Sequence, residues 1–184
     1  MTLLVLGLTL FLGIHLLPSV PVWREVLVAR LGAKAYRGLF ALVSFLGFGL
    51  IIYGKSHAPY VHGFFPPPWG RHLTLTLMLL SAIALAAIYL PTNLKRFTPH
   101  PMLWSTTLWA GAHLCANGDV ASLLLFGSFL GFGLFDIWSC NRRGALPKKE
   151  RVPLVKDLLV VGLGLISYGV LIVLHPLVIG VPVF

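Results

Sequence analysis

The sequence predicts an all-α, polytopic membrane bundle of six transmembrane helices, forming a single domain over residues 1–184. Three observations lead to this prediction. First, 58% of the residues are apolar and only 10% are charged, whereas about a quarter of the residues in soluble domains are charged. Second, the apolar residues gather in runs that approach the ~20 residues needed to cross a bilayer. Third, most of the 14 basic residues lie in the short segments between these runs, which is typical of membrane topology and not of nucleic-acid binding.

The apolar runs define the predicted spans, which are residues 3–17, 37–53, 72–90, 102–116, 120–140 and 158–181. No basic region precedes the first run, so we expect a retained span and not a cleaved signal peptide. Residues 21–34 mix basic and apolar side chains, which favours a segment lying on the membrane surface. Three successive prolines, at positions 66–68, exclude a helix interior from the loop at residues 55–71. The fourth run is short, so we expect it to start in the interface or to lean on its neighbours.

The basic residues also predict the orientation of the chain. If the N-terminus is outside, the loops after spans one, three and five hold 12 of the 14 basic residues, and only Lys55 and Arg71 fall outside them. Cytoplasmic loops are enriched in Lys and Arg. We therefore expect these three loops to be cytoplasmic and both termini to be periplasmic.

Residues 99–119 are predicted to form one short helix with an ionisable ring at each end. Pro101 suits the first helical turn, Gly118 suits the left-handed position that stops a helix, and Asp119 can cap the helix that follows. His100 and His113 are 13 residues apart, about 20 Å along a helix axis, and point in different directions. The two rings therefore cannot ligate one metal ion, and each needs a partner from another helix.

Ionisable side chains inside spans are costly and are candidates for function. Depth within the predicted spans pairs His15 with His100 on the cytoplasmic side, and His113 with His72 or His175 on the periplasmic side. Paired carboxylates, a Ser-His-Asp arrangement and a phosphate-binding glycine loop are all missing from the sequence. Imidazoles within a helical bundle then indicate metal or haem ligation. The alternative for each of these histidines is a hydrogen bond that only holds helices together.

Two further polar contacts are predicted near these rings. Asn117 lies one turn after His113, which suggests a polar path from the ring through Asn117 to Asp119 that orients the imidazole. Asp136, near the end of its span, is expected to pair with Arg142 or Arg143.

Several short runs resemble a known family. His-Pro-Met-Leu-Trp at residues 100–104, Leu-Trp-Ala at 108–110, Ala-His-Leu at 112–114 and Asn-Gly-Asp at 117–119 resemble the NnrU family of bacterial inner-membrane proteins. Gly-Ile-His-Leu-Leu-Pro-Ser at residues 13–19 is similar to the first span of that family. The resemblance implies a bacterial inner-membrane location and a link to denitrification, in nitrite and nitric oxide metabolism.

The same resemblance implies a cofactor. The NnrU family is related to zeta-carotene isomerase, a membrane protein that uses haem b, and this relation implies that His15 and His100 are the axial ligands of a haem b iron. It also implies a small hydrophobic substrate or nitric oxide as the partner. The family pattern has an Arg before His-Pro, where this chain has Pro99. Arg96 or Lys95 is expected to replace the missing guanidinium.

These observations leave three functional hypotheses. The leading one is a haem b protein with redox-linked or isomerase-like chemistry. The second is a non-enzymatic membrane assembly or transport factor. The third is a membrane methyltransferase of the isoprenylcysteine type, suggested by the His-Pro pattern, although the downstream acidic residue and the extended cytoplasmic segment expected of such an enzyme are missing.

Overall fold

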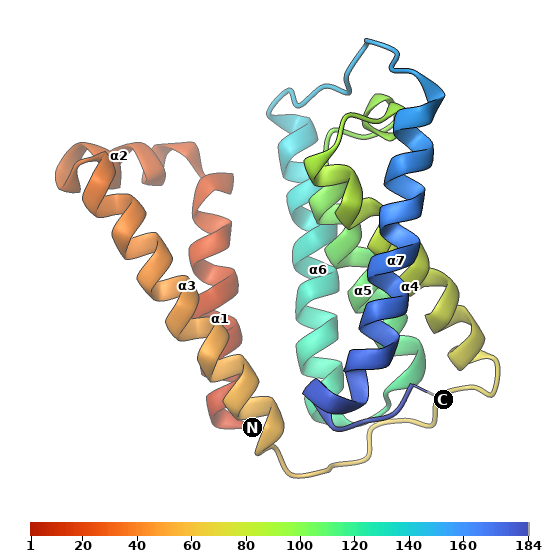
Figure 1. Cartoon of the computed structure of the whole chain (residues 1–184). Helices are drawn as coiled ribbons and strands as arrows, with labels where there is room; N and C mark the ends of the chain where they lie inside the picture. The colour runs from red at the N-terminus through yellow and green to blue at the C-terminus, as the bar shows by residue number, and fades with distance from the viewer. Residues whose placement is uncertain (184) are drawn as a thin grey trace.

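The computed structural model describes residues 1–183, and this part of the chain is helical without β-strands (Figure 1). The α-helices are α1 (Thr2–Leu16), α2 (Pro21–Leu31), α3 (Ala33–Ser56), α4 (Gly70–Tyr89), α5 (Pro101–Ala116), α6 (Val120–Arg142) and α7 (Leu154–Ile179). Two short 3₁₀ helices, η1 (Leu17–Ser19) and η2 (Asn93–Arg96), follow α1 and α4. A helix stands at each of the six predicted spans, and the predicted surface segment is α2.

Five segments of the described chain are long and apolar enough to cross a membrane: residues 2–19, α3, α4, α6 and α7. The fourth predicted span corresponds to α5, which has 16 residues and is shorter than a bilayer crossing needs. It packs between α4 and α6. These longer helices therefore surround α5 with apolar side chains, although α5 is itself too short to cross a bilayer.

The helices form two groups, which Figure 1 shows side by side. Helices α1 and α3 pair as a hairpin, and α4, α5, α6 and α7 form a bundle. Within the hairpin the backbones approach closely at Gly54, where a Cβ atom would collide with the backbone of Leu4. Small residues that allow such an approach are typical of helix pairs in membranes.

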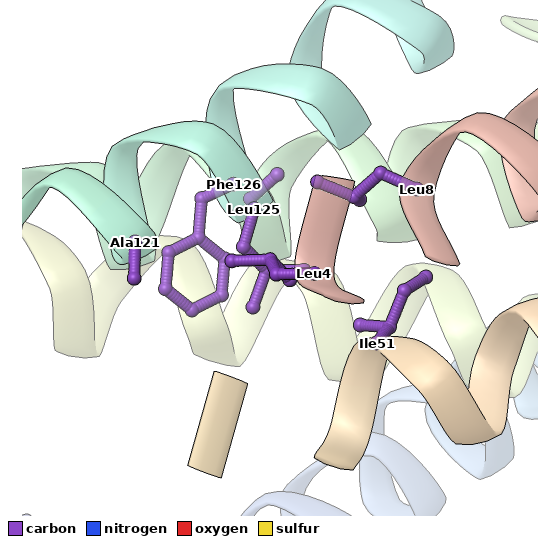
Figure 2. Packing of buried hydrophobic residues seen from close by; sticks show 7 residues of the cluster. Leu4, Leu8, Ile51, Ala121, Leu125 and Phe126 are labelled. Carbon is purple, nitrogen blue, oxygen red and sulfur yellow. The ribbon is translucent and has the colours of Figure 1, made fainter. Parts of the chain in front are cut away.

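The main core lies where the hairpin meets α6 (Figure 2). It is formed by Leu4 and Leu8 of α1, Ile51 of α3, and Phe126 with its neighbours on α6. These α6 residues belong to the first two turns of the helix. The hairpin is therefore joined to the bundle at the end where α6 begins.

The N-terminus and the last described residues of the chain lie at this same end of the molecule, whereas α2 and the basic loops before α5 and after α6 lie at the opposite end (Figure 1). At that opposite end Asp157 accepts hydrogen bonds from Thr92 Oγ1 (2.6 Å) and Asn93 Nδ2 (2.6 Å). These bonds tie the first turn of α7 to the η2 loop. The predicted cytoplasmic loops thus gather on one side of the fold.

Candidate functional site

The turn between α5 and α6 is built largely as the sequence predicts. Pro101 occupies the first turn of α5, and Asp119 Oδ1 accepts a hydrogen bond from Ser122 N at 2.9 Å as the cap of α6. The prediction of a left-handed Gly118 is wrong, because no positive φ occurs there. Glycine is required instead by a close approach, since a Cβ atom would collide with the Phe64 carbonyl oxygen. The carbonyl of Gly118 accepts hydrogen bonds from the N–H groups of Gly63 and Phe64, both at 2.9 Å.

Asp119 is also the centre of a charged cluster. Lys55 Nζ donates to Asp119 Oδ1 at 2.9 Å and to Ser122 Oγ at 2.8 Å. Burial raises the pKa of Asp119, but the hydrogen bonds from Ser122 and Lys55 outweigh burial and hold the pKa below its usual value. Asp119 therefore acts as a helix cap and as an ion-pair partner, and the predicted link to the His113 ring is not made.

His15 lies in a site walled by aromatic rings from three helices. The centroid of its ring is 4.3 Å from that of Phe11 on α1, 5.1 Å from that of Phe40 on α3 and 6.3 Å from that of Phe132 on α6. Its Nδ1–H donates to the Phe11 carbonyl at 2.6 Å. Because a carbonyl only accepts, this bond fixes the tautomer and leaves Nε2 with a lone pair.

His100 is 9% exposed and lies just before the first turn of α5. Its Nε2–H donates to Asn141 Oδ1 at 2.9 Å, and its backbone N–H donates to Thr98 Oγ1 at 3.1 Å. The ring thus connects the start of α5 to the end of α6, and its Nε2 is engaged.

His15 and His100 approach α6 from different sides. His15 contacts Phe132, and His100 bonds to Asn141. These two residues are nine positions apart, which corresponds to about 13.5 Å along the axis and about half a turn around it. The structure therefore does not bring the two predicted axial ligands together across one iron.

His113 is held by its own helix. Its Nδ1–H donates to the Trp109 carbonyl at 2.8 Å, and its ring stacks on Phe126 with centroids 4.5 Å apart. Asn117 Nδ2 donates to the backbone carbonyl of His113 at 2.8 Å and not to the ring. Of the two predicted periplasmic partners, His72 lies in the first turn of α4, and His175 donates from Nδ1 to the Val181 carbonyl. Within residues 1–183, no three His, Cys, Asp or Glu side chains form a group that could hold a metal ion.

The two candidates for the missing guanidinium differ in their surroundings. Lys95 Nζ donates to the carbonyls of Ile88 and Leu90, and both burial and the nearby Lys148 lower the pKa of Lys95. Arg96 Nε is a buried donor that has no hydrogen-bond partner in the described part of the chain. Two of the three N–H donors of Lys95 are therefore occupied, whereas Arg96 keeps a buried donor without a partner among the described residues.

Several features of this region were not predicted. Asp136 pairs with Arg143 at 3.7 Å as expected, but it also accepts a 2.7 Å hydrogen bond from Ser19 Oγ. An open apolar groove of about 420 Å³ lies between Leu12 and Leu16 of α1 and five residues of α6 from Gly127 to Phe135. One signal was available for the aromatic site, since Phe11 and His15 are four residues apart and share a helix face. Phe40 and Phe132 give no such signal.

Comparison with known protein families identifies a relationship that covers most of the chain. A family model described as NnrU protein matches residues 3–183, nearly the whole chain. No curated protein matches, and no solved structure matches.

Proposed function

The chain belongs to the NnrU family, and from this premise we propose that it is a bacterial inner-membrane protein that binds haem b through His15. The proposal includes a role in denitrification, with nitric oxide or a small hydrophobic molecule as the ligand. His15 is the observation that supports it most directly.

The hydrogen bond of His15 supports ligation. Histidines bound to metals nearly always donate their other N–H to a carbonyl, a carboxylate or water, which fixes the tautomer and the ring orientation. His15 has this arrangement, because Nδ1–H donates to the Phe11 carbonyl at 2.6 Å. Nε2 then carries the lone pair and is the ring atom that would bind the iron.

The aromatic walls support the same site. Phe11, Phe40 and Phe132 surround the ring from three helices, and such rings exclude water and can pack against a flat macrocycle. Haem b held by a single histidine supplies an iron with an open coordination position, as in globins and peroxidases. In this proposal the three phenylalanines keep the site dry, and His15 orients the group.

His100 has a separate role in this proposal. Its Nε2–H donates to Asn141, which leaves Nδ1 as the ring nitrogen with a lone pair. The α6 residues that the His100 and His15 rings contact lie about 13.5 Å apart along the helix axis, so ligation of one iron by both histidines requires the helices to move. We therefore assign His100 to the junction of α5 and α6, and the two-histidine arrangement stays a prediction that variants can test.

The experiment is a visible spectrum of the full chain, purified in mild detergent after expression with a haem precursor, with and without dithionite. We expect a Soret band that His15→Ala removes. His100→Ala should retain it, as should the control His57→Ala, which changes an exposed ring. A band lost in His100→Ala supports the two-histidine arrangement, a band lost only in His113→Ala moves the site to the other end, and no band in any preparation overturns haem binding.

A second candidate is a non-enzymatic assembly or transport factor. It is favoured by the observation that His15 and His113 each donate to a carbonyl four residues earlier in their own helix, so the N–H of each ring is satisfied without a ligand. Full-length protein that is stable after His15→Ala, and that never takes up added haem, would support this second candidate.

A further inference from the structure

The floor of the groove between α1 and α6 is formed by two glycines, and helix packing does not explain why these positions are glycine. Gly127 and Gly131 are one helical turn apart in α6, and a Cβ atom at either position would meet nothing within 4 Å. Glycine weakens a helix relative to alanine, and no close helix approach at these positions compensates. The two glycines therefore leave space for a ligand or another chain to pack against the surface of α6.

One face of α6 connects the groove to a cationic side chain. Ser128, Phe135 and Arg142 follow each other at intervals of seven residues, so they lie along one side of the helix. Phe135 lines the groove, and its ring centroid is 5.7 Å from that of Trp138. The guanidinium carbon of Arg142 lies 5.0 Å from the centroid of the Trp138 ring.

Arg142 is exposed and, unlike its neighbour Arg143, forms no ion pair with another part of residues 1–183. It is the last residue of α6, and Trp138 is one turn before it, at the depth where Trp and Arg mark the membrane interface. An unpaired cation at the end of an apolar groove is complementary to a molecule with an apolar chain and an anionic head.

The lengths agree with a phospholipid. Gly131 is 11 residues before Arg142, about 16.5 Å along the helix axis at 1.5 Å per residue. Half of the hydrocarbon core of a bilayer is about 15 Å thick. An acyl chain that starts at the interface beside Arg142 therefore ends near the glycine floor.

We propose that the α1–α6 groove binds one acyl chain of an anionic phospholipid, whose phosphate pairs with Arg142. The lipid belongs to the leaflet at the Arg142 end of α6, which is the cytoplasmic leaflet in the predicted orientation. Basic side chains between transmembrane helices recognise anionic headgroups in this way. The groove is walled on α1 by Leu12 and Leu16 and shares Phe132 with the aromatic wall around His15. Its glycine floor and Arg142 take no part in that wall.

The test is native mass spectrometry of the detergent-purified full chain, incubated with equal amounts of phosphatidylglycerol and phosphatidylcholine that carry the same acyl chains. We expect one bound lipid per chain, with phosphatidylglycerol preferred about fivefold, the ratio that one basic residue near the surface provides. Gly131→Leu places a side chain on the floor, where a Cβ atom meets nothing within 4 Å, and should remove the bound lipid. Gly49→Leu is the matched control, because Gly49 also faces open space but lies on α3 outside the groove.

Arg142→Gln separates the two parts of the site. It should keep a bound lipid but lose the preference for phosphatidylglycerol, and it decides the question if Gly131→Leu fails to fold. Equal binding of the two lipids by the unmodified chain overturns the proposal. So does lipid that is retained in Gly131→Leu, or lost equally in Gly49→Leu. A dimer that Gly131→Leu dissociates would overturn it in favour of a second copy of the chain.

Discussion

Lys55 Nζ and Asp119 Oδ1 lie 2.9 Å apart and join the last turn of α3 to the cap of α6. Because Lys55 also donates to Ser122 Oγ, its ammonium group forms hydrogen bonds with both Asp119 and Ser122 at the start of α6. This cluster connects the hairpin to the bundle at the end where the main core lies. At the opposite end, the hydrogen bond from Ser19 to Asp136 makes a second connection.

Loss of the Asp119 carboxylate should destabilise the protein. Asp119→Ala removes a helix cap, and such a change costs roughly 0.5–2 kcal/mol; it also leaves Lys55 without its anionic partner. Thermal unfolding in detergent measures the effect as a lower midpoint. The control is Glu25→Ala, which removes an exposed acid on α2 and should leave the midpoint unchanged. Equal midpoints for Asp119→Ala and the unmodified chain would contradict the assigned role.

The contribution of Asp119 should also depend on pH. Its pKa in the folded protein is below the usual value of about 3.9, so the unfolded chain takes up a proton before the folded one does. The stabilisation is therefore complete above pH ~4 and is lost as the pH falls from there through the lowered pKa. Unfolding midpoints of the unmodified chain and Asp119→Asn, compared across this range, should differ most above pH ~4 and converge in acid. A difference that grows toward low pH would reverse the sign and refute the prediction.

Gly118→Ala should disturb the contact between the α5–α6 turn and the loop before α4. The added methyl group meets the Phe64 carbonyl oxygen, so the loop must shift, and overpacking of this kind costs about 1–3 kcal/mol. Gly162→Ala on α7 is the matched control, because its methyl group enters open space and a better helix former should stabilise the helix by up to about 1 kcal/mol. The two variants should therefore move the unfolding midpoint in opposite directions.

Asn141→Ala should leave the buried His100 ring without its partner. An unsatisfied buried donor costs about 1–3 kcal/mol, which thermal unfolding detects. If His100 stabilises the fold mainly through its hydrogen bond to Asn141, then His100→Ala should lose about as much stability as Asn141→Ala. The double variant His100→Ala/Asn141→Ala should lose no more than either single variant. Fully additive losses would show that the two side chains act independently.

The sequence predicts the helices well because membrane spans are local features. The α6 helix begins at the predicted residue, Val120, and ends two residues beyond the prediction, at Arg142. The prediction for α7 starts four residues late, since the polar residues Lys156 and Asp157 were assigned to the loop. In the structure Asp157 belongs to the first turn, where it accepts bonds from Thr92 and Asn93. Such a contact with a distant loop has no signal in the hydropathy of its own segment.

The candidate site was less predictable from the sequence. Hydropathy indicates how deep a side chain lies in the membrane, but not which neighbouring helix it faces. The sequence predicts similar depths for His15 and His100, but the α6 residues that the two rings contact, Phe132 and Asn141, differ both in height along the helix and in direction around it. Both differences follow from the packing of α1 and α5 against α6, which the sequence does not specify. The aromatic wall around His15 depends on Phe40 and Phe132, which come from distant parts of the sequence.

The division into a hairpin and a bundle has a consequence for how the protein is made. Both helices of the hairpin, with the close approach of Gly54 to Leu4, are contained in the first 56 residues. A nascent chain emerges from its N-terminus, so this helix pair can assemble in the bilayer before α4 leaves the ribosome. The surface of α6 that the hairpin covers is translated much later, and until then Leu4, Leu8 and Ile51 face lipid or the insertion machinery.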